Sequence, residues 1–175
     1  MRWVAFIRAV NLGARNKVPM AELRTRLESA GYEGVRTYIA SGNVLLEGPA
    51  RRAELGKALE RLVADAFGVA TTAVLRKPRE LAATVAAHPF GSYTSETYVA
   101  FLAARPADTA VARLEEAQGA AERAVVEGAD VYLRLPRGVH SSGLSVARVE
   151  SLLGVQATLR NWRTVAALVE LSAEA

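Results

Sequence analysis

The sequence predicts an α+β fold built from two ferredoxin-like βαββαβ repeats with antiparallel sheets and an extra C-terminal helix. Strand-like and helix-like segments occur twice in the order β-α-β-β-α-β, starting near residues 2 and 97. Apolar residues make up 51% of the 175 positions, which is enough to bury a core. Gly31, Gly68 and Gly154 each follow a helical run, where a glycine commonly ends a helix.

In the first repeat, the apolar run at residues 2–9 predicts a strand that is buried on both faces. Pro19 suits the first helical position, and apolar residues recur from there at helical spacing. Val35, Thr37 and Ile39 alternate with polar neighbours, which indicates a strand. The expected elements are strands at 2–9, 35–39, 44–47 and 71–76, and helices at 19–30 and 51–67.

In the second repeat, Ser145 is a suitable N-cap for a helix that ends before Gly154. The expected elements are strands at 97–104, 124–127, 131–135 and 156–160, and helices at 107–117, 145–153 and 162–172. A short helix at 79–87 joins the repeats. We therefore divide the chain into residues 1–78, which carry polar loops, and residues 79–175, and expect the two to form one compact unit.

The charges are unevenly distributed. The net charge is +4, and residues 1–52 hold nine Arg or Lys against four acids, whereas the remainder is nearly balanced. This favours an anionic partner for the first repeat, with a merely solvated basic surface as the alternative. The chain has no cysteine and no apolar stretch of membrane-spanning length, so we expect a cytoplasmic protein without disulfides or thiolate metal sites.

Polar residues gather at three junctions between elements. Arg8, Asn11 and Lys17 lie between the first strand and the first helix, where an anion is often bound. Val18, at the expected N-cap, offers no side-chain acceptor, so we expect the helix N–H groups to stay open. Two further groups complete the candidate site: Ser41, Gly42 and Asn43 in a turn, and Arg160, Asn161 and Thr164 at the start of the last helix.

Residues 6–13 (FIRAVNLG), 18–23 (VPMAEL), 37–44 (TYIASGNV) and 157–165 (ATLRNWRTV) resemble the signatures of an uncharacterised bacterial family, domain of unknown function 1697. Pro89-Phe90 matches a shorter motif. The resemblance implies two βαββαβ repeats and places the family's polar signature on the nine residues named above, but it implies no activity. Two residues depart from the pattern: Ala9 replaces a usual Gly, and Ala167 stands where Lys is common.

Other chemistry has less support. The first loop lacks the Gly-Lys-Ser/Thr ending of a P-loop and the G-x-G-x-x-G pattern of dinucleotide sites. Ser41 has no histidine near it in sequence, and His88 and His140 lie outside the family signatures. The spacing of acids and histidines predicts no metal site, and we expect no cofactor. Whether the protein is an enzyme is left open.

Three functions remain. The favoured hypothesis is a pocket for a small anionic or phosphate-containing ligand, formed where the 8–17 loop, the 41–43 turn and the 160–164 helix start converge. The alternatives are a nucleic-acid-binding module that uses the basic first half, and a structural or partner-binding protein. The nucleic-acid-binding alternative has less support, because the 44–47 strand has no aromatic residue on which a base could stack. The first strand does carry two aromatic residues, Trp3 and Phe6. The sequence predicts no oligomeric state.

Overall fold

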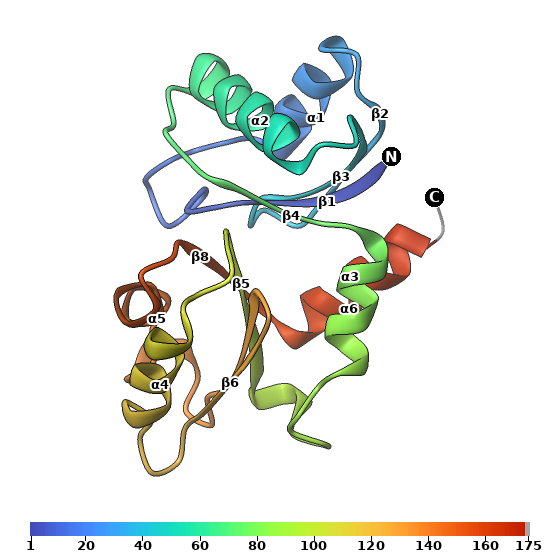
Figure 1. The fold of residues 1–175 in the computed structure, drawn as a ribbon. Helices are drawn as coiled ribbons and strands as arrows, with labels where there is room; N and C mark the ends of the chain where they lie inside the picture. The colour runs from blue at the N-terminus through green and yellow to red at the C-terminus, as the bar shows by residue number, and fades with distance from the viewer. Residues whose placement is uncertain (174–175) are drawn as a thin grey trace. The chain divides into compact units, whose positions relative to one another are not determined.

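The structure, a computed structural model, describes residues 1–173 and confirms the predicted fold class (Figure 1). Two four-stranded antiparallel sheets each belong to a βαββαβ repeat. The strands are β1 (Arg2–Ile7), β2 (Glu33–Tyr38), β3 (Asn43–Glu47), β4 (Ala73–Arg76), β5 (Thr97–Leu102), β6 (Arg123–Glu127), β7 (Asp130–Arg134) and β8 (Ala157–Asn161). The helices are α1 (Met20–Ser29), α2 (Arg52–Phe67), α3 (Pro78–Ala86), α4 (Asp108–Glu116), α5 (Val146–Leu153) and α6 (Trp162–Ala173).

The first sheet has the strand order β2-β3-β1-β4, and α1 and α2 lie on one of its faces (Figure 1). The central strand β1 pairs with β3 from Arg2 opposite Glu47 to Phe6 opposite Asn43. Its odd-numbered residues, Trp3 among them, join the core beneath the two helices. The even-numbered Phe6 is also fully buried, so β1 is covered on both faces, as its unbroken apolar run predicts.

The second sheet repeats this arrangement with the order β6-β7-β5-β8 and with α4 and α5 on one face (Figure 1). Its central strand β5 pairs with β7 and β8, and residues 99–102 are all buried. A separate apolar core lies beneath α4 and α5 and includes Leu114, Leu133 and Val149.

Matching details support an internal duplication. Both second helices of the repeats end at a left-handed glycine, Gly68 with φ 66° and Gly154 with φ 67°. A glutamate on each of these helices then accepts a hydrogen bond from the first backbone N–H of the following strand. Glu60 accepts from Ala73 at 2.9 Å and Glu150 accepts from Ala157 at 2.8 Å. The two repeats therefore close their last strand in the same way.

The chain divides into two compact units. Unit 1 contains Met1–Leu81 together with the C-terminal residues from Leu168 on, and unit 2 contains Ala82–Ala167. The end of α6 returns to unit 1, where the Arg36 guanidinium donates to the carbonyl of Leu171 at 2.9 Å. The division of the sequence into residues 1–78 and 79–175 stays a prediction.

Strands β1 and β2 are shorter than expected because a residue that is not glycine adopts left-handed backbone after each of them. β1 ends at Ile7 rather than near Ala9, since Ala9 has a φ of 54°. β2 ends at Tyr38 because Ile39 has a φ of 50°, which is uncommon for a β-branched residue. Helix α1 begins at Met20, with Pro19 as its N-cap in place of the expected Val18.

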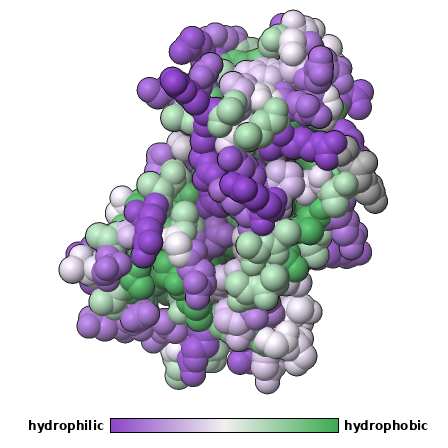
Figure 2. Space-filling view, turned by 45° about the vertical axis from the view of Figure 1, so that its right-hand side comes forward, coloured by the Kyte–Doolittle hydropathy of each residue, from purple (hydrophilic) through white to green (hydrophobic). Residues whose placement is uncertain are grey.

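The face shown in Figure 2 mixes polar and apolar residues. In Figure 2, hydrophilic residues drawn in purple are interspersed with apolar ones in green over the visible face. Within residues 1–173, no helix combines the length and apolar character needed to cross a membrane.

Candidate functional site

The 8–17 loop is a compact structure held by its own hydrogen bonds. The backbone N–H of Asn11 donates to the carbonyl of Asn16 at 2.9 Å, and the Asn16 side chain donates to the carbonyl of Ala9 at 2.9 Å. Arg15 donates from its backbone to Leu12 at 3.2 Å, which closes an exposed tip. Ala9, Asn11 and Asn16 all have positive φ, so the shape of the loop depends on left-handed backbone at three non-glycine residues.

The Asn11 side chain fixes this loop to its surroundings. Its Oδ1 accepts from the N–H of Val18 at 2.8 Å, and its Nδ2 donates to the carbonyls of Val18 at 2.9 Å and Ala40 at 2.7 Å. One amide thereby joins the loop, the approach to α1 and the segment after β2. These three bonds give Asn11 a structural role, and one of them occupies the N–H of Val18.

The 41–43 turn packs closely beneath the loop. The N–H of Ile7 donates to the carbonyl of Gly42 at 2.8 Å. A Cβ at Gly42 would lie 2.6 Å from the Ile7 carbonyl oxygen and 2.7 Å from Cγ2 of Val10, so only glycine fits. Asn43 is fully buried, and its amide donates to the carbonyl of Tyr38 at 3.0 Å and to Oγ of Ser41 at 2.9 Å. The turn thus supports the loop from inside the fold.

A groove lies where the loop, the end of β2 and the start of α1 meet, and we call it the Lys17 groove. It is shallow and open to solvent, with a volume of about 530 Å³. Its lining residues are Asn11, Lys17, Val18, Pro19, Met20, Thr37, Ile39 and Ala40. Lys17 is exposed, and Ile39 is 52% exposed, which is unusual for a large apolar side chain in this protein.

The electrostatics of the Lys17 groove favour negative charge. No side chain in the described part of the chain caps α1, whose N-cap is Pro19. The first N–H groups of a helix have no partner within it, and the helix dipole makes this end positive. The Lys17 ammonium adds a full positive charge. The groove therefore combines a cation with a helix start that no side chain caps, and Glu22 in the first turn of α1 is paired with Arg26 at 3.1 Å.

Of the nine predicted site residues, the Lys17 groove contains two, Asn11 and Lys17. Arg8 is half-buried in the same unit, where its N–H donates to the carbonyl of Thr72 at 3.0 Å, but it does not line the groove. Ser41, Gly42 and Asn43 are also not among its lining residues. The ligand-binding role of these four residues stays a prediction.

Arg160, Asn161 and Thr164 belong to unit 2. Arg160 is only 7% exposed and donates to Oγ1 of Thr158 at 2.7 Å and to the carbonyl of Leu159 at 2.8 Å. Burial lowers the pKa of its guanidinium to about 10. Oδ1 of Asn161 accepts from the N–H of Thr164 at 2.8 Å, which caps α6. These contacts give all three residues a part in folding unit 2, and their ligand-binding role stays a prediction.

His88 and His140 belong to unit 2, and His88 contacts other residues of that unit. Nε2 of His88 lies 3.0 Å from Oγ1 of Thr97, and its ring centroid is 4.2 Å from that of Trp162. His140 is exposed. Over the same residues, no group of three or more metal-ligating side chains comes together.

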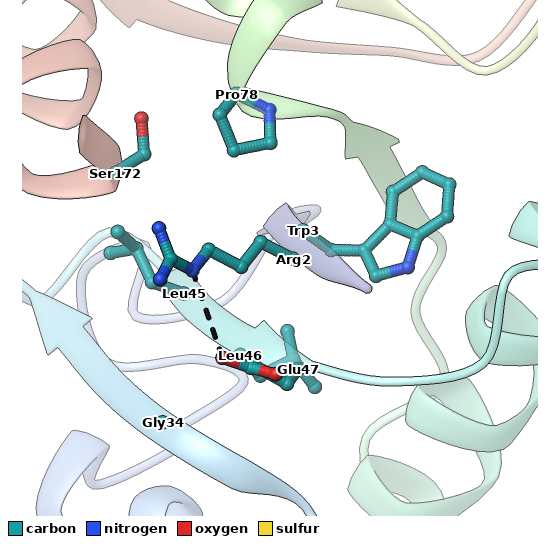
Figure 3. A pocket seen from close by; sticks show the side chains of 8 residues that line it. All are labelled: Arg2, Trp3, Gly34, Leu45, Leu46, Glu47, Pro78 and Ser172. Atoms are coloured by element: carbon teal, nitrogen blue, oxygen red, sulfur yellow. Dashed lines mark ion pairs between the residues drawn. The ribbon is translucent and has the colours of Figure 1, made fainter. Parts of the chain in front are cut away.

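A second, smaller cavity lies on unit 1 between β1, β2 and β3 and the end of α6 (Figure 3). Its volume of about 20 Å³ suits roughly one water molecule. Arg2 and Glu47 face each other across it with 3.7 Å between Nε and Oε1. Both side chains are close to half-exposed, so their attraction is largely screened. This cavity contains none of the predicted site residues and is too small for an organic ligand.

Sequence reasoning missed the contribution of Thr37, Ile39 and Ala40 to the Lys17 groove. These residues were assigned to a strand and its end, where alternation predicts packing rather than binding. Their position just before Ser41 could have indicated this contribution. A polar turn at the end of a strand lies at the same edge of the sheet as the residues that precede it.

The order β-α-β-β-α-β, present twice with matching strand orders, defines a duplicated ferredoxin-like α+β protein. Residues 1–132 match the model of a protein family of unknown function, DUF1697, and the chain belongs to this family. The 8–17 loop and the 41–43 turn fall within the match, and the 157–165 motif lies beyond it.

A solved structure supports the fold over nearly the whole chain. The conserved bacterial protein SP0830 from Streptococcus pneumoniae is similar with a TM-score of 0.76 and 23% sequence identity, and the similarity covers 98% of each chain. At this identity the similarity bears on the fold alone. No curated protein matches the chain.

Proposed function

We propose that unit 1 binds a small anionic ligand, of the phosphate or carboxylate class, in the Lys17 groove. One observation carries the proposal: the groove brings an exposed lysine together with the uncapped N-terminus of α1 in about 530 Å³ of open space. Both features attract negative charge, and the space admits a ligand larger than a single ion.

The rigidity of the surrounding loop supports the proposal. Three hydrogen bonds from the Asn11 side chain and the tight Ile7–Gly42 approach hold the walls of the groove before any ligand arrives. A preformed site loses little conformational entropy on binding. Lys17 and the helix N-terminus are both exposed to solvent, so we expect a weak affinity that decreases as the salt concentration rises.

The nucleic-acid alternative has less support. Trp3 is 1% exposed and Phe6 is fully buried. Neither ring on β1 offers a face on which a base could stack, and stacking on exposed sheet aromatics is how RNA-recognition sheets bind. A ligand held at the loop edge of unit 1 agrees better with the exposed side chains.

The test is a thermal-shift titration with inorganic phosphate, pyrophosphate and citrate at constant ionic strength. Lys17→Gln removes the cation of the groove, and Lys57→Gln removes an exposed cation on α2 as the matched control. We expect a saturable rise in Tm with at least one of the three anions, lost in Lys17→Gln and retained in Lys57→Gln. An equal response in both variants, or no response to any of the anions, would refute the proposal.

A further inference from the structure

The second sheet has a free edge at β6, which pairs with β7 and, within residues 1–173, with no other strand. The register places Glu127 opposite Asp130 across a two-residue turn, so the N–H and C=O of Glu127 face β7. Along a strand, the backbone N–H and C=O groups of successive residues point alternately to one side and to the other. The backbone groups of Ala124 and Val126 therefore point away from the sheet, toward the position that a fifth strand would take.

The side chain of Gln118 covers half of this edge. Its Nε2 donates to the carbonyl of Ala124 at 3.1 Å, and its Oε1 accepts from the N–H of Ala124 at 3.1 Å. One side-chain amide thus takes both hydrogen bonds that a residue of a neighbouring strand would make. In the described part of the chain, no side chain does the same for Val126.

The β6 sequence is complementary to itself when it is reversed. Antiparallel pairing of two β6 strands centred on Val125 places Arg123 opposite Glu127 of the partner subunit at both ends. Ala124 then lies opposite Val126 of the partner subunit, and these are the residues whose backbone groups point outward. The arrangement satisfies the outward groups and puts opposite charges together, which stabilises cross-strand pairs.

We propose that the β6 edge can pair with the β6 edge of a second copy of this chain, and that the Gln118 side chain prevents this pairing. Gln118 is tethered to the same chain, so its amide competes at a high effective concentration with a strand that must arrive by diffusion. With Gln118 bound to Ala124 the chain remains monomeric. Removal of the Gln118 amide allows two copies to form a dimer with two-fold symmetry. The proposal concerns unit 2 and is independent of the Lys17 groove.

The test is sedimentation velocity of the full chain over a range of concentrations. Gln118→Ala and Gln118→Met both remove the two hydrogen bonds, and methionine retains the length of the half-buried side chain. We expect the original chain to sediment as a monomer and at least one folded variant to form a dimer at micromolar concentration. Folded variants that stay monomeric at the highest concentration reached, or an original chain that already dimerises through β6, would overturn the proposal.

Two additional changes in the Gln118→Met background test the geometry of the dimer. Val126→Pro removes an N–H that points away from β7, so the β6–β7 ladder is kept while the new pairing is broken. Glu127→Arg places like charges opposite each other at both ends, and we expect the dimer dissociation constant to rise by about tenfold. A dimer unaffected by both changes would use another surface and would contradict the proposal.

Discussion

Gly42 lies so close to β1 that a larger residue at this position should destabilise unit 1. In Gly42→Ala the new Cβ would lie 2.6 Å from the carbonyl oxygen of Ile7 and 2.7 Å from Cγ2 of Val10. The φ of 81° at this position adds left-handed strain for any other residue. That strain costs about 1–2 kcal/mol and the forced displacement about 1–3 kcal/mol, so the free energy of unfolding should decrease by roughly 2–5 kcal/mol.

Gly13→Ala is the matched control in the same unit. Gly13 has a φ of 59°, and nothing lies within 4 Å of the position of its Cβ. This substitution carries the left-handed strain without the contact, so we expect it to cost about 1–2 kcal/mol. The difference between the two variants isolates the contribution of the Ile7–Gly42 approach.

The assay is urea unfolding followed by tryptophan fluorescence. The chain has two tryptophans, and Trp3 lies in unit 1 whereas Trp162 lies in unit 2. A Trp162→Phe background leaves Trp3 as the reporter of unit 1, which avoids averaging over two unfolding transitions. If Gly42→Ala proved no more destabilising than Gly13→Ala, the tight packing of the turn against β1 would be wrong.

Three other side chains have effects that follow from their contacts. Asn11→Ala leaves the buried Val18 N–H unpaired and should cost about 2–3 kcal/mol in urea unfolding. Asn161→Ala removes the cap of α6 and should cost about 1 kcal/mol in the same assay. Burial lowers the pKa of His88, so the folded state binds fewer protons than the unfolded state. Stability should therefore decrease as the pH falls below about 6.5, and His88→Gln should flatten that slope in pH-dependent thermal unfolding.

The sequence predicted the order of elements well because that order depends on local patterns. Apolar residues at helical spacing marked α1 and α2, and Gly68 and Gly154 end helices as expected, both in left-handed backbone. Ser145 caps α5 through a bond from the N–H of Arg148, also as expected. In each of these cases the physical cause lies within a few residues of its effect.

The limits of strands and the lining of the site were harder to predict. Ala9 and Ile39 end their strands in left-handed backbone, and neither residue type indicates this conformation. The sequence places Asn11 and Asn43 at junctions between elements. It does not show that the Asn11 amide donates to the carbonyl of Ala40 or that the Asn43 amide donates to the carbonyl of Tyr38. Whether such a side chain is open to a ligand depends on tertiary contacts that no local pattern records.

The most direct test of the Lys17 groove is a phosphate titration of the ¹⁵N-labelled chain, followed by two-dimensional amide NMR at constant ionic strength. We predict saturable shifts concentrated on the backbone amides of Lys17, Met20 and Ala21, at the loop end and the first turn of α1. Saturable shifts concentrated at residues 160–164, or weak non-saturating shifts spread over exposed basic residues, would contradict the account.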